Sequence, residues 1–243
     1  MAVYRDRGVV LRTYRLGEAD RIVVVLTEGH GKVRAVAKGV RKTKSRFGSR
    51  LEPTSHVALL LYEGRQNEGG QLDTITQADT IEHHPTMRQD LHRLGKATAV
   101  LEAVDHVAQE REPDAQLYRM AVGALRALEQ RDSPLLVAAF YWKLLAAEGV
   151  APMVDACARC GATEDLVAFD LVEGGVLCRS CRTGTAVSPA ALALLRRVLQ
   201  GELNAALAEP DGPAIAELDA MATRAMEGHI ERRLKTQAVH LDT

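Results

Sequence analysis

The sequence lacks any long apolar run. Apolar stretches such as residues 22–26 and 57–62 are far shorter than the roughly 20 residues that a membrane span needs. The first seven residues also lack the apolar core of a secretory signal. We therefore expect a protein of the reducing cytoplasm with no membrane partner, in which cysteines serve as thiols or metal ligands rather than as disulfides.

Local patterns typical of catalysis are also missing. Gly31-Lys32 is followed by Val33, and position 26, where a Walker-type phosphate loop has its first glycine, holds Leu26. No His-Glu-x-x-His segment occurs anywhere in the chain. The sequence therefore predicts a protein that hydrolyses no ATP and is not an enzyme.

Charge is distributed unevenly along the 243 residues. The composition, 47% hydrophobic and 26% charged, is that of a globular protein, and the length favours two domains. Residues 1–50 carry a local balance of +9, whereas the remaining residues carry −10. This asymmetry indicates that the basic residues 1–50 bind an anionic partner.

The densest basic segment extends over residues 32–50 and contains no acid. Most charge runs are solvated loops without a partner, and that alternative stands here beside nucleic-acid binding. The candidate phosphate contacts are its eight cations: Lys32, Arg34, Lys38, Arg41, Lys42, Lys44, Arg46 and Arg50.

The first 80 residues read as short strands. Candidate strands lie at residues 8–14, 21–27, 32–38, 56–62 and 71–78, with turn residues at 28–31. In the third strand, alternation places Val33, Ala35 and Ala37 on one face and Lys32, Arg34 and Lys38 on the other. Five short strands in about 80 residues predict an OB-fold barrel, a fold that commonly binds oligonucleotides.

Aromatic residues make up only 4% of the chain, so we expect few base contacts and weak sequence preference. Phe47 is the best candidate for stacking on a base, because it lies inside the basic segment. An equally good interpretation is that Phe47 anchors the loop in the core of the barrel.

Beyond Pro85 the hydrophobic period changes from two to 3.6, which predicts helices. Two of them are expected to begin at Ser133-Pro134 and Ser188-Pro189 and to end near Gly149 and Gly201. The predicted division is an OB-fold domain over residues 1–80, a helical domain over 81–154 and 186–243, and an insertion over 155–185.

All four cysteines lie in that insertion, as two Cys-x-x-Cys pairs separated by 17 residues. This spacing is typical of a tetrahedral four-thiolate zinc site, and residues 166–170 and 175–177 would form the hairpin of a zinc ribbon. Two disulfides are the alternative, which a reducing compartment disfavours. We predict one structural Zn²⁺ per chain, held by Cys157, Cys160, Cys178 and Cys181.

Several segments resemble a known family. Residues 10–21, then Thr27 with Gly31, then the Lys-Gly-Val-Arg-Lys-Thr-Lys-Ser segment at 38–45 are similar to the N-terminal signature of the bacterial recombination mediator RecO family. Residues 140–149, followed by Pro152 and the first cysteine pair, resemble the helix that leads into that family's cysteine ribbon.

The resemblance implies a DNA repair role at the nucleoid. Members of the family bind single- and double-stranded DNA, anneal complementary strands and work with RecR to help RecA replace single-strand-binding protein. On the matching segment, the resemblance assigns DNA contacts to Lys38, Arg41, Lys42 and Lys44.

Two other functional classes stay open at this point. A barrel-plus-ribbon protein could bind structured RNA in transcription or translation. A zinc-dependent hydrolase would need an open coordination position, which four thiolates do not leave.

Overall fold

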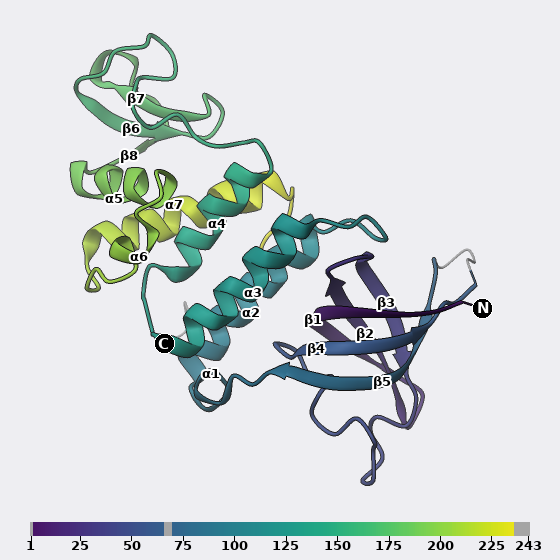
Figure 1. The fold of residues 1–243 in the computed structure, drawn as a ribbon. Helices are drawn as coiled ribbons and strands as arrows, with labels where there is room; N and C mark the ends of the chain where they lie inside the picture. Colours follow the sequence, from purple (N-terminus) through teal and green to yellow (C-terminus); the bar gives the residue numbers. More distant parts are fainter. Residues whose placement is uncertain (1, 66–69, 236–243) are drawn as a thin grey trace. The chain divides into compact units, whose positions relative to one another are not determined.

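The computed structural model describes residues 2–65 and 70–235, and the chain divides into two compact units, Met1–Gln130 and Arg131–Thr243 (Figure 1). Residues 236–243 of the predicted helical domain lie outside the described residues. The division predicted from the sequence is finer than these two units, and its three parts stay a prediction.

The first unit begins with a closed five-stranded barrel (Figure 1). Its order is β1-β2-β3-β5-β4, in which β3 and β5 pair in parallel and all other neighbours are antiparallel. This confirms the predicted OB-fold barrel. The strands are β1 (Val3–Leu16), β2 (Asp20–Thr27), β3 (Gly31–Ala37), β4 (His56–Tyr62) and β5 (Asp73–Glu82).

Period-two alternation gives the barrel its core. Val33, Ala35 and Ala37 of β3 are fully buried in it, as predicted, together with inward-facing β-branched residues of β2. The β2–β3 turn closes through Thr27, whose hydroxyl donates to the carbonyl of Gly31 at 2.9 Å. Gly31 has φ +65 and lies so close to Glu112 that a Cβ would meet its carbonyl oxygen at 2.1 Å. Only glycine fits this approach.

Three helices complete the first unit: α1 (Pro85–Gln89), α2 (Leu91–Val107) and α3 (Ala115–Gln130). Asp90 caps α2, because its carboxylate accepts from the backbone N–H groups of His92 and Arg93. His56 of β4 bonds the Tyr118 hydroxyl of α3 at 2.8 Å. The His56–Tyr118 hydrogen bond joins α3 to the outer wall of the barrel.

A buried ion pair ties the α2–α3 connection to the barrel. Arg111 contacts the carboxylate of Asp73 at 2.7 Å, and Asp73 also accepts from the Tyr4 hydroxyl and from the backbone N–H of Gly64. Burial alone would raise the pKa of Asp73, but these donors and the Arg111 charge outweigh it and lower the pKa. Burial and the neighbouring carboxylate raise the pKa of Tyr4, so its hydroxyl stays a donor.

The second unit contains helices and a small cysteine-bearing ribbon. Ser188 caps α5 as predicted, by accepting from the N–H of Ala191 at 3.1 Å. Ser133 does not cap α4: a turn at Pro134 and Leu135 intervenes, so the helix begins at Leu136. The elements are α4 (Leu136–Ala147), β6 (Leu166–Asp170), β7 (Gly175–Cys178), η1 (Arg179–Cys181), β8 (Thr185–Ala186), α5 (Pro189–Leu199), α6 (Leu203–Ala206) and α7 (Pro213–His229).

The ribbon is a three-stranded antiparallel sheet in the order β7-β6-β8, which confirms the predicted hairpin. Phe169 of β6 packs edge-on against Trp142 of α4 at 5.5 Å between ring centroids. Arg196 of α5 donates two hydrogen bonds to the carbonyl of Val154, just before the ribbon. Within residues 2–65 and 70–235, no helix has the length and hydropathy of a membrane span.

Candidate nucleic-acid interface and metal centre

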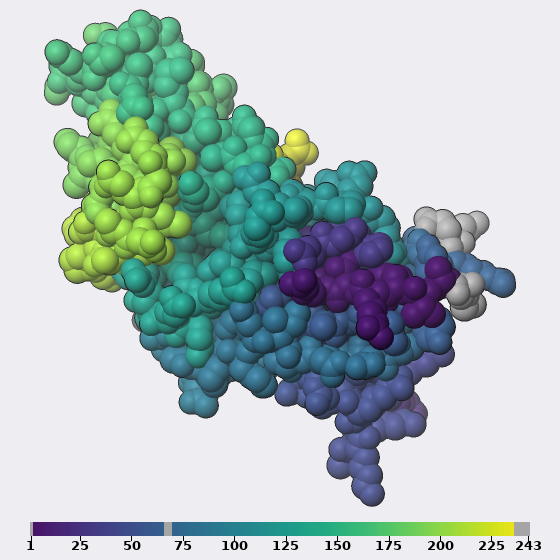
Figure 2. Space-filling model, in the orientation of Figure 1, coloured from purple at the N-terminus to yellow at the C-terminus, as the bar shows by residue number. Residues whose placement is uncertain are grey.

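Most of the basic segment lies in a long loop between β3 and β4, residues 38–55, which projects from the barrel as the blue-violet extension in Figure 2. The loop is fixed where it leaves β3. The backbone N–H of Gly39 donates to the Asp20 carboxylate at 2.7 Å, and that of Arg41 donates to the carbonyl of Ala19 at 3.0 Å. Its base therefore lies against the tip of the β1–β2 hairpin.

Apolar side chains anchor the middle of this loop in the barrel. Phe47 is only 1% exposed and belongs to the barrel core with Val40 and Leu51. The predicted stacking of Phe47 on a base is therefore corrected: the ring fills the core, as the alternative interpretation had it. The Arg46 guanidinium lies over the outer part of the ring, 4.9 Å from its centroid.

The six cations of the loop are exposed, and none of them pairs with a carboxylate in the described part of the chain. Arg41 and Arg50 donate to backbone carbonyls, at 2.9 Å to Glu18 and 3.0 Å to Arg46. The one acid of the loop, Glu52, is held by Arg21 at 2.6 Å. The six are Lys38, Arg41, Lys42, Lys44, Arg46 and Arg50.

The two cations of β3 itself have a different environment. The Lys32 side chain is 13% exposed, and its ammonium donates to the backbone carbonyl of Asp105 at 2.6 Å and lies 3.5 Å from the Asp105 carboxylate. Arg34 is half-buried and also has partners within the protein. Because Lys32 is held by Asp105 of α2 and Arg34 has partners of its own, we leave both out of the candidate DNA surface.

Asp105 is a residue that the sequence reasoning missed. It is 7% exposed, lies on the buried face of α2, and also pairs with Arg12 at 2.7 Å. A signal was present, because an acid that follows Ala103 and Val104 on the packed face of a helix requires a cationic partner. The sequence does not say which cation that is.

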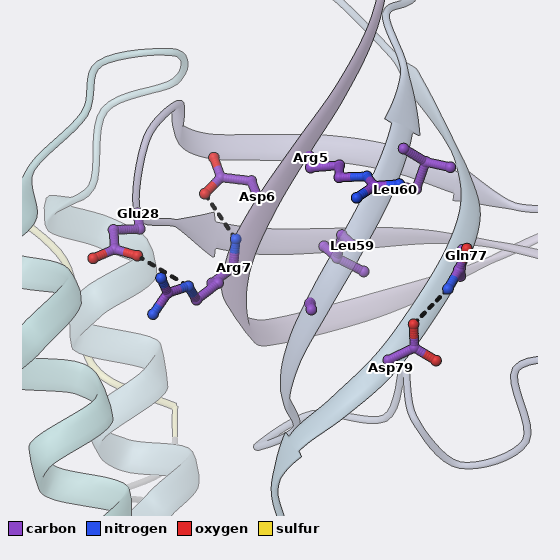
Figure 3. Close-up of a pocket in the computed structure, with 9 residues that line it drawn as sticks. Arg5, Asp6, Arg7, Glu28, Leu59, Leu60, Gln77 and Asp79 are labelled. Carbon is purple, nitrogen blue, oxygen red and sulfur yellow. Dashed lines mark hydrogen bonds and ion pairs between the residues drawn. The ribbon is translucent and has the colours of Figure 1, made fainter.

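A polar hollow of about 470 Å³ lies on another face of the barrel, over β1, β4 and β5 (Figure 3). Its lining includes two cations and three acids, and it is therefore slightly acidic. Arg7 lies 3.7 Å from Glu28, and Asp79 accepts from Gln77 at 2.6 Å. Arg5 is exposed and has no hydrogen bond or ion pair among the described residues. A slightly acidic surface attracts phosphates weakly, which makes Arg5 useful as a control position.

The four cysteines come together in the ribbon, as predicted. Their sulfur atoms all lie within 4.8 Å of one another, and the Sγ atoms of Cys160 and Cys178 are 3.7 Å apart. Tetrahedral zinc–sulfur bonds of about 2.3 Å separate their sulfurs by about 3.8 Å. The cluster therefore has the dimensions of a four-thiolate metal site.

Backbone groups around the cluster favour thiolates. The N–H of Cys178, followed by those of Cys160 and Arg159, lowers the pKa of Cys157 to about 6, although burial opposes this. Hydrogen bonding to Cys160 raises the pKa of Cys181 to about 12. The cluster thus holds its first negative charge readily and resists further ones, and a divalent cation relieves that repulsion.

Each Cys-x-x-Cys pair lies in a tight turn, or knuckle, and local hydrogen bonds stabilise these turns. The N–H of Gly161 donates to the carbonyl of Cys157 at 2.8 Å, in a turn where Gly161 has φ +77. Arg159 crosses to the second knuckle, donating to the carbonyl of Cys181 at 3.2 Å and to the Glu173 carboxylate at 2.7 Å. The four positions face one point and leave no place among them for a substrate, which suits a structural metal.

Comparison with known proteins agrees with this architecture. A family model described as recombination protein O N terminal matches residues 1–84, and one described as recombination protein O C terminal matches residues 88–238. The chain is 44% identical over 241 residues to DNA repair protein RecO of Frankia casuarinae, with 97% of each chain covered. The chain therefore belongs to the RecO family of DNA repair and recombination proteins.

Proposed function

We propose that this protein is a recombination mediator that binds single- and double-stranded DNA through the β3–β4 loop and anneals complementary strands. The observation that carries the proposal is the set of six exposed loop cations without carboxylate partners. Cations that are not neutralised within the protein remain available to phosphates, which supply most of the affinity in sequence-independent binding.

Annealing follows from the same chemistry. Loop cations that neutralise phosphates of two strands lower the repulsion between those strands. Few aromatic contacts leave the Watson–Crick edges of the bases free to pair. The proposed mediator needs no nucleotide hydrolysis for this step, so it acts by binding rather than as an enzyme.

In the full reaction the protein acts with partners. We propose that it works with RecR, contacts DNA covered by single-strand-binding protein, and so helps RecA to load onto that DNA in the cytoplasm, at the nucleoid. Family membership supports this role. Residues 1–80 would bind DNA, while the helical domain and the ribbon over 155–185 would complete the scaffold.

We further propose that Cys157, Cys160, Cys178 and Cys181 hold one structural Zn²⁺ per chain. The sulfur–sulfur distances and the lowered pKa of Cys157 support this assignment. With four thiolates as ligands, zinc would supply fixed cross-links between the two knuckles and no reaction chemistry.

Charge reversal in the loop tests the proposal. The double variant Arg41→Glu/Lys42→Glu should lose at least about tenfold in DNA affinity and anneal strands correspondingly more slowly. For the parent, log K on single strands should fall with log salt at a slope of about −4, and for the variant at about −3. Its melting temperature should stay that of the parent, because both side chains are exposed.

The matched control is Arg5→Glu on the β1–β4–β5 face, which should leave affinity and annealing unchanged. A loop variant that binds and anneals like the parent would contradict the proposal.

A titration with folded RNA and with single-stranded DNA, each with and without RecR, separates a mediator from an RNA-binding module, which would prefer RNA to single-stranded DNA. Loading of RecA onto DNA coated with single-strand-binding protein should accelerate with parent plus RecR and not with the loop variant.

A further inference from the structure

Among the residues that the structure describes, two aromatic side chains are exposed, and both belong to the barrel: Tyr14 on β1 and Tyr62 on β4, at 43% and 44%. They lie at opposite ends of β1, since Tyr62 pairs with Val3 while Tyr14 pairs with Ile22. Because Phe47 is buried, Tyr14 is the exposed ring nearest to the basic loop along the sheet.

The sheet places Tyr14 beside the loop. Tyr14, Ile22 and Val36 form one row across β1, β2 and β3, and Leu16 pairs with Asp20 two residues further along, in the next row on the same face. Lys38 directly follows β3 at the level of that second row. Two strand spacings separate β1 from β3, about 10 Å in all. The hydrogen bonds from Gly39 and Arg41 to the β1–β2 tip keep the loop at this end.

The Tyr14 ring is also held in place. The Arg12 guanidinium lies over the ring, 5.1 Å from its centroid, and Arg12 is itself fixed by the Asp105 carboxylate at 2.7 Å. A cation over one face of a tyrosine ring leaves the opposite face for another planar group. A ring that is already ordered loses little entropy when a ligand binds to it.

We propose that Tyr14 is a stacking platform for one base of single-stranded DNA whose phosphates engage the β3–β4 loop. This inference rests on the proposed function and adds a contact that phosphate binding does not require. Stacking uses the flat face of a base and is sequence-tolerant, and it leaves the Watson–Crick edge free. One platform next to a cationic loop would retain single strands while they anneal.

The test compares an oligothymidylate with an abasic oligonucleotide of the same length. Tyr14→Ala should weaken oligothymidylate binding about tenfold, which corresponds to about 1.4 kcal/mol, and should leave abasic and duplex DNA unaffected. Tyr14→Phe should bind like the parent, because the ring is retained. Tyr62→Ala is the matched control and should change none of these affinities.

A spectroscopic arm reports stacking directly. In Tyr14→Trp the new indole should be quenched by oligothymidylate and not by the abasic strand, over a constant signal from the buried Trp142. Absence of quenching, equal losses on all three DNAs, or parent-like binding of Tyr14→Ala would each overturn the inference. The loop variant separates the two proposals: if Tyr14 gives one of these outcomes while the loop variant still weakens binding to every DNA, the proposed function stands and the role of Tyr14 falls.

Discussion

The barrel and the cysteine ribbon differ in what fills their cores. Fourteen apolar residues from all five strands and the β3–β4 loop are buried in the barrel. The core cluster of the ribbon has four residues, Ala168, Leu177, Cys157 and Cys178, and two of these are candidate metal ligands. Burial of apolar surface can stabilise the barrel, but a core as small as that of the ribbon rarely stabilises a fold alone.

This difference separates function from stability. In the barrel, the inward residues of each strand fold the domain, so the loop is free to carry charge that no carboxylate neutralises. In the ribbon, the residues with chemistry are themselves the core. A change at a loop cation should therefore alter binding and leave folding intact, whereas a change at a cysteine should alter folding first.

The largest expected effect is loss of the metal. Cys157→Ser/Cys160→Ser removes two of four ligands, and structural zinc sites contribute about 10–16 kcal/mol of binding free energy to folding in small zinc domains. We expect zinc content to fall to background and the amides of residues 155–185 to exchange rapidly, while the barrel amides stay protected and DNA binding is partly retained. Metal analysis and hydrogen exchange measure both.

Ser180→Ala is the control for that experiment, because Ser180 lies in η1 between ligands of the second knuckle without supplying one. It should keep its zinc. Full metal retention in the cysteine variant would contradict the site, and simultaneous loss of protection in the barrel would remove the contrast between the two cores.

A smaller effect is expected at the buried ion cluster of the first unit. Asp105→Asn keeps the size of the side chain but leaves the nearly buried Lys32 without its carboxylate. Loss of one partner from a buried ion pair lowers the free energy of unfolding by about 3–5 kcal/mol. Because Arg12 is half-exposed, we expect a smaller loss here, of about 2–3 kcal/mol. Denaturant-dependent hydrogen exchange in β3 and α2 measures the loss.

Asp79→Asn provides the comparison, since Asp79 is exposed and accepts only from Gln77 among the described residues. It should change the free energy of unfolding by less than about 0.5 kcal/mol. Equal effects of the two variants would mean that Asp105 does not act through Lys32 and Arg12.

Local patterns predicted much of this architecture. Period-two alternation in β3 identified Val33, Ala35 and Ala37 as core, and the two Cys-x-x-Cys pairs identified the sulfur cluster. Ser188 followed by Pro189 gave the start of α5. Each of these features has a signal in residues close together in the sequence, either in one strand, in one helix start or in two closely spaced cysteine pairs, so the sequence alone suffices to predict it.

Features that depend on distant residues were not predictable. Phe47 is buried because the loop folds back over the barrel, and Lys32 is neutralised by Asp105, 73 positions away. In both cases the local segment was predicted correctly, as a basic loop around Phe47 and as a basic strand at Lys32. The deciding contact came from tertiary packing, which a single sequence does not specify.

The smallest expected effect is a dependence of stability on pH, which we expect in the first unit because its buried histidines lie there. His84 is 3% exposed, and its ring nitrogens have no hydrogen-bond partner among the described residues. Burial lowers the pKa of His84, and the charges of Arg88 and His56 lower it further. The carboxylates of Glu82 and Glu129 act in the opposite direction. Burial likewise lowers the pKa of His56, although Glu82 opposes it.

Below about pH 6.5 the unfolded chain therefore binds more protons at these two histidines than the folded chain, and the stability of the first unit should fall as pH decreases. His84→Leu should reduce that pH dependence between pH 7.5 and 6.0, because it removes one group whose pKa is lowered by folding. Protection of barrel and α1 amides measures this, with zinc content followed in the same samples. An unchanged slope in His84→Leu would show that His84 has the same pKa in both states, and the acid sensitivity of the barrel would then rest on His56.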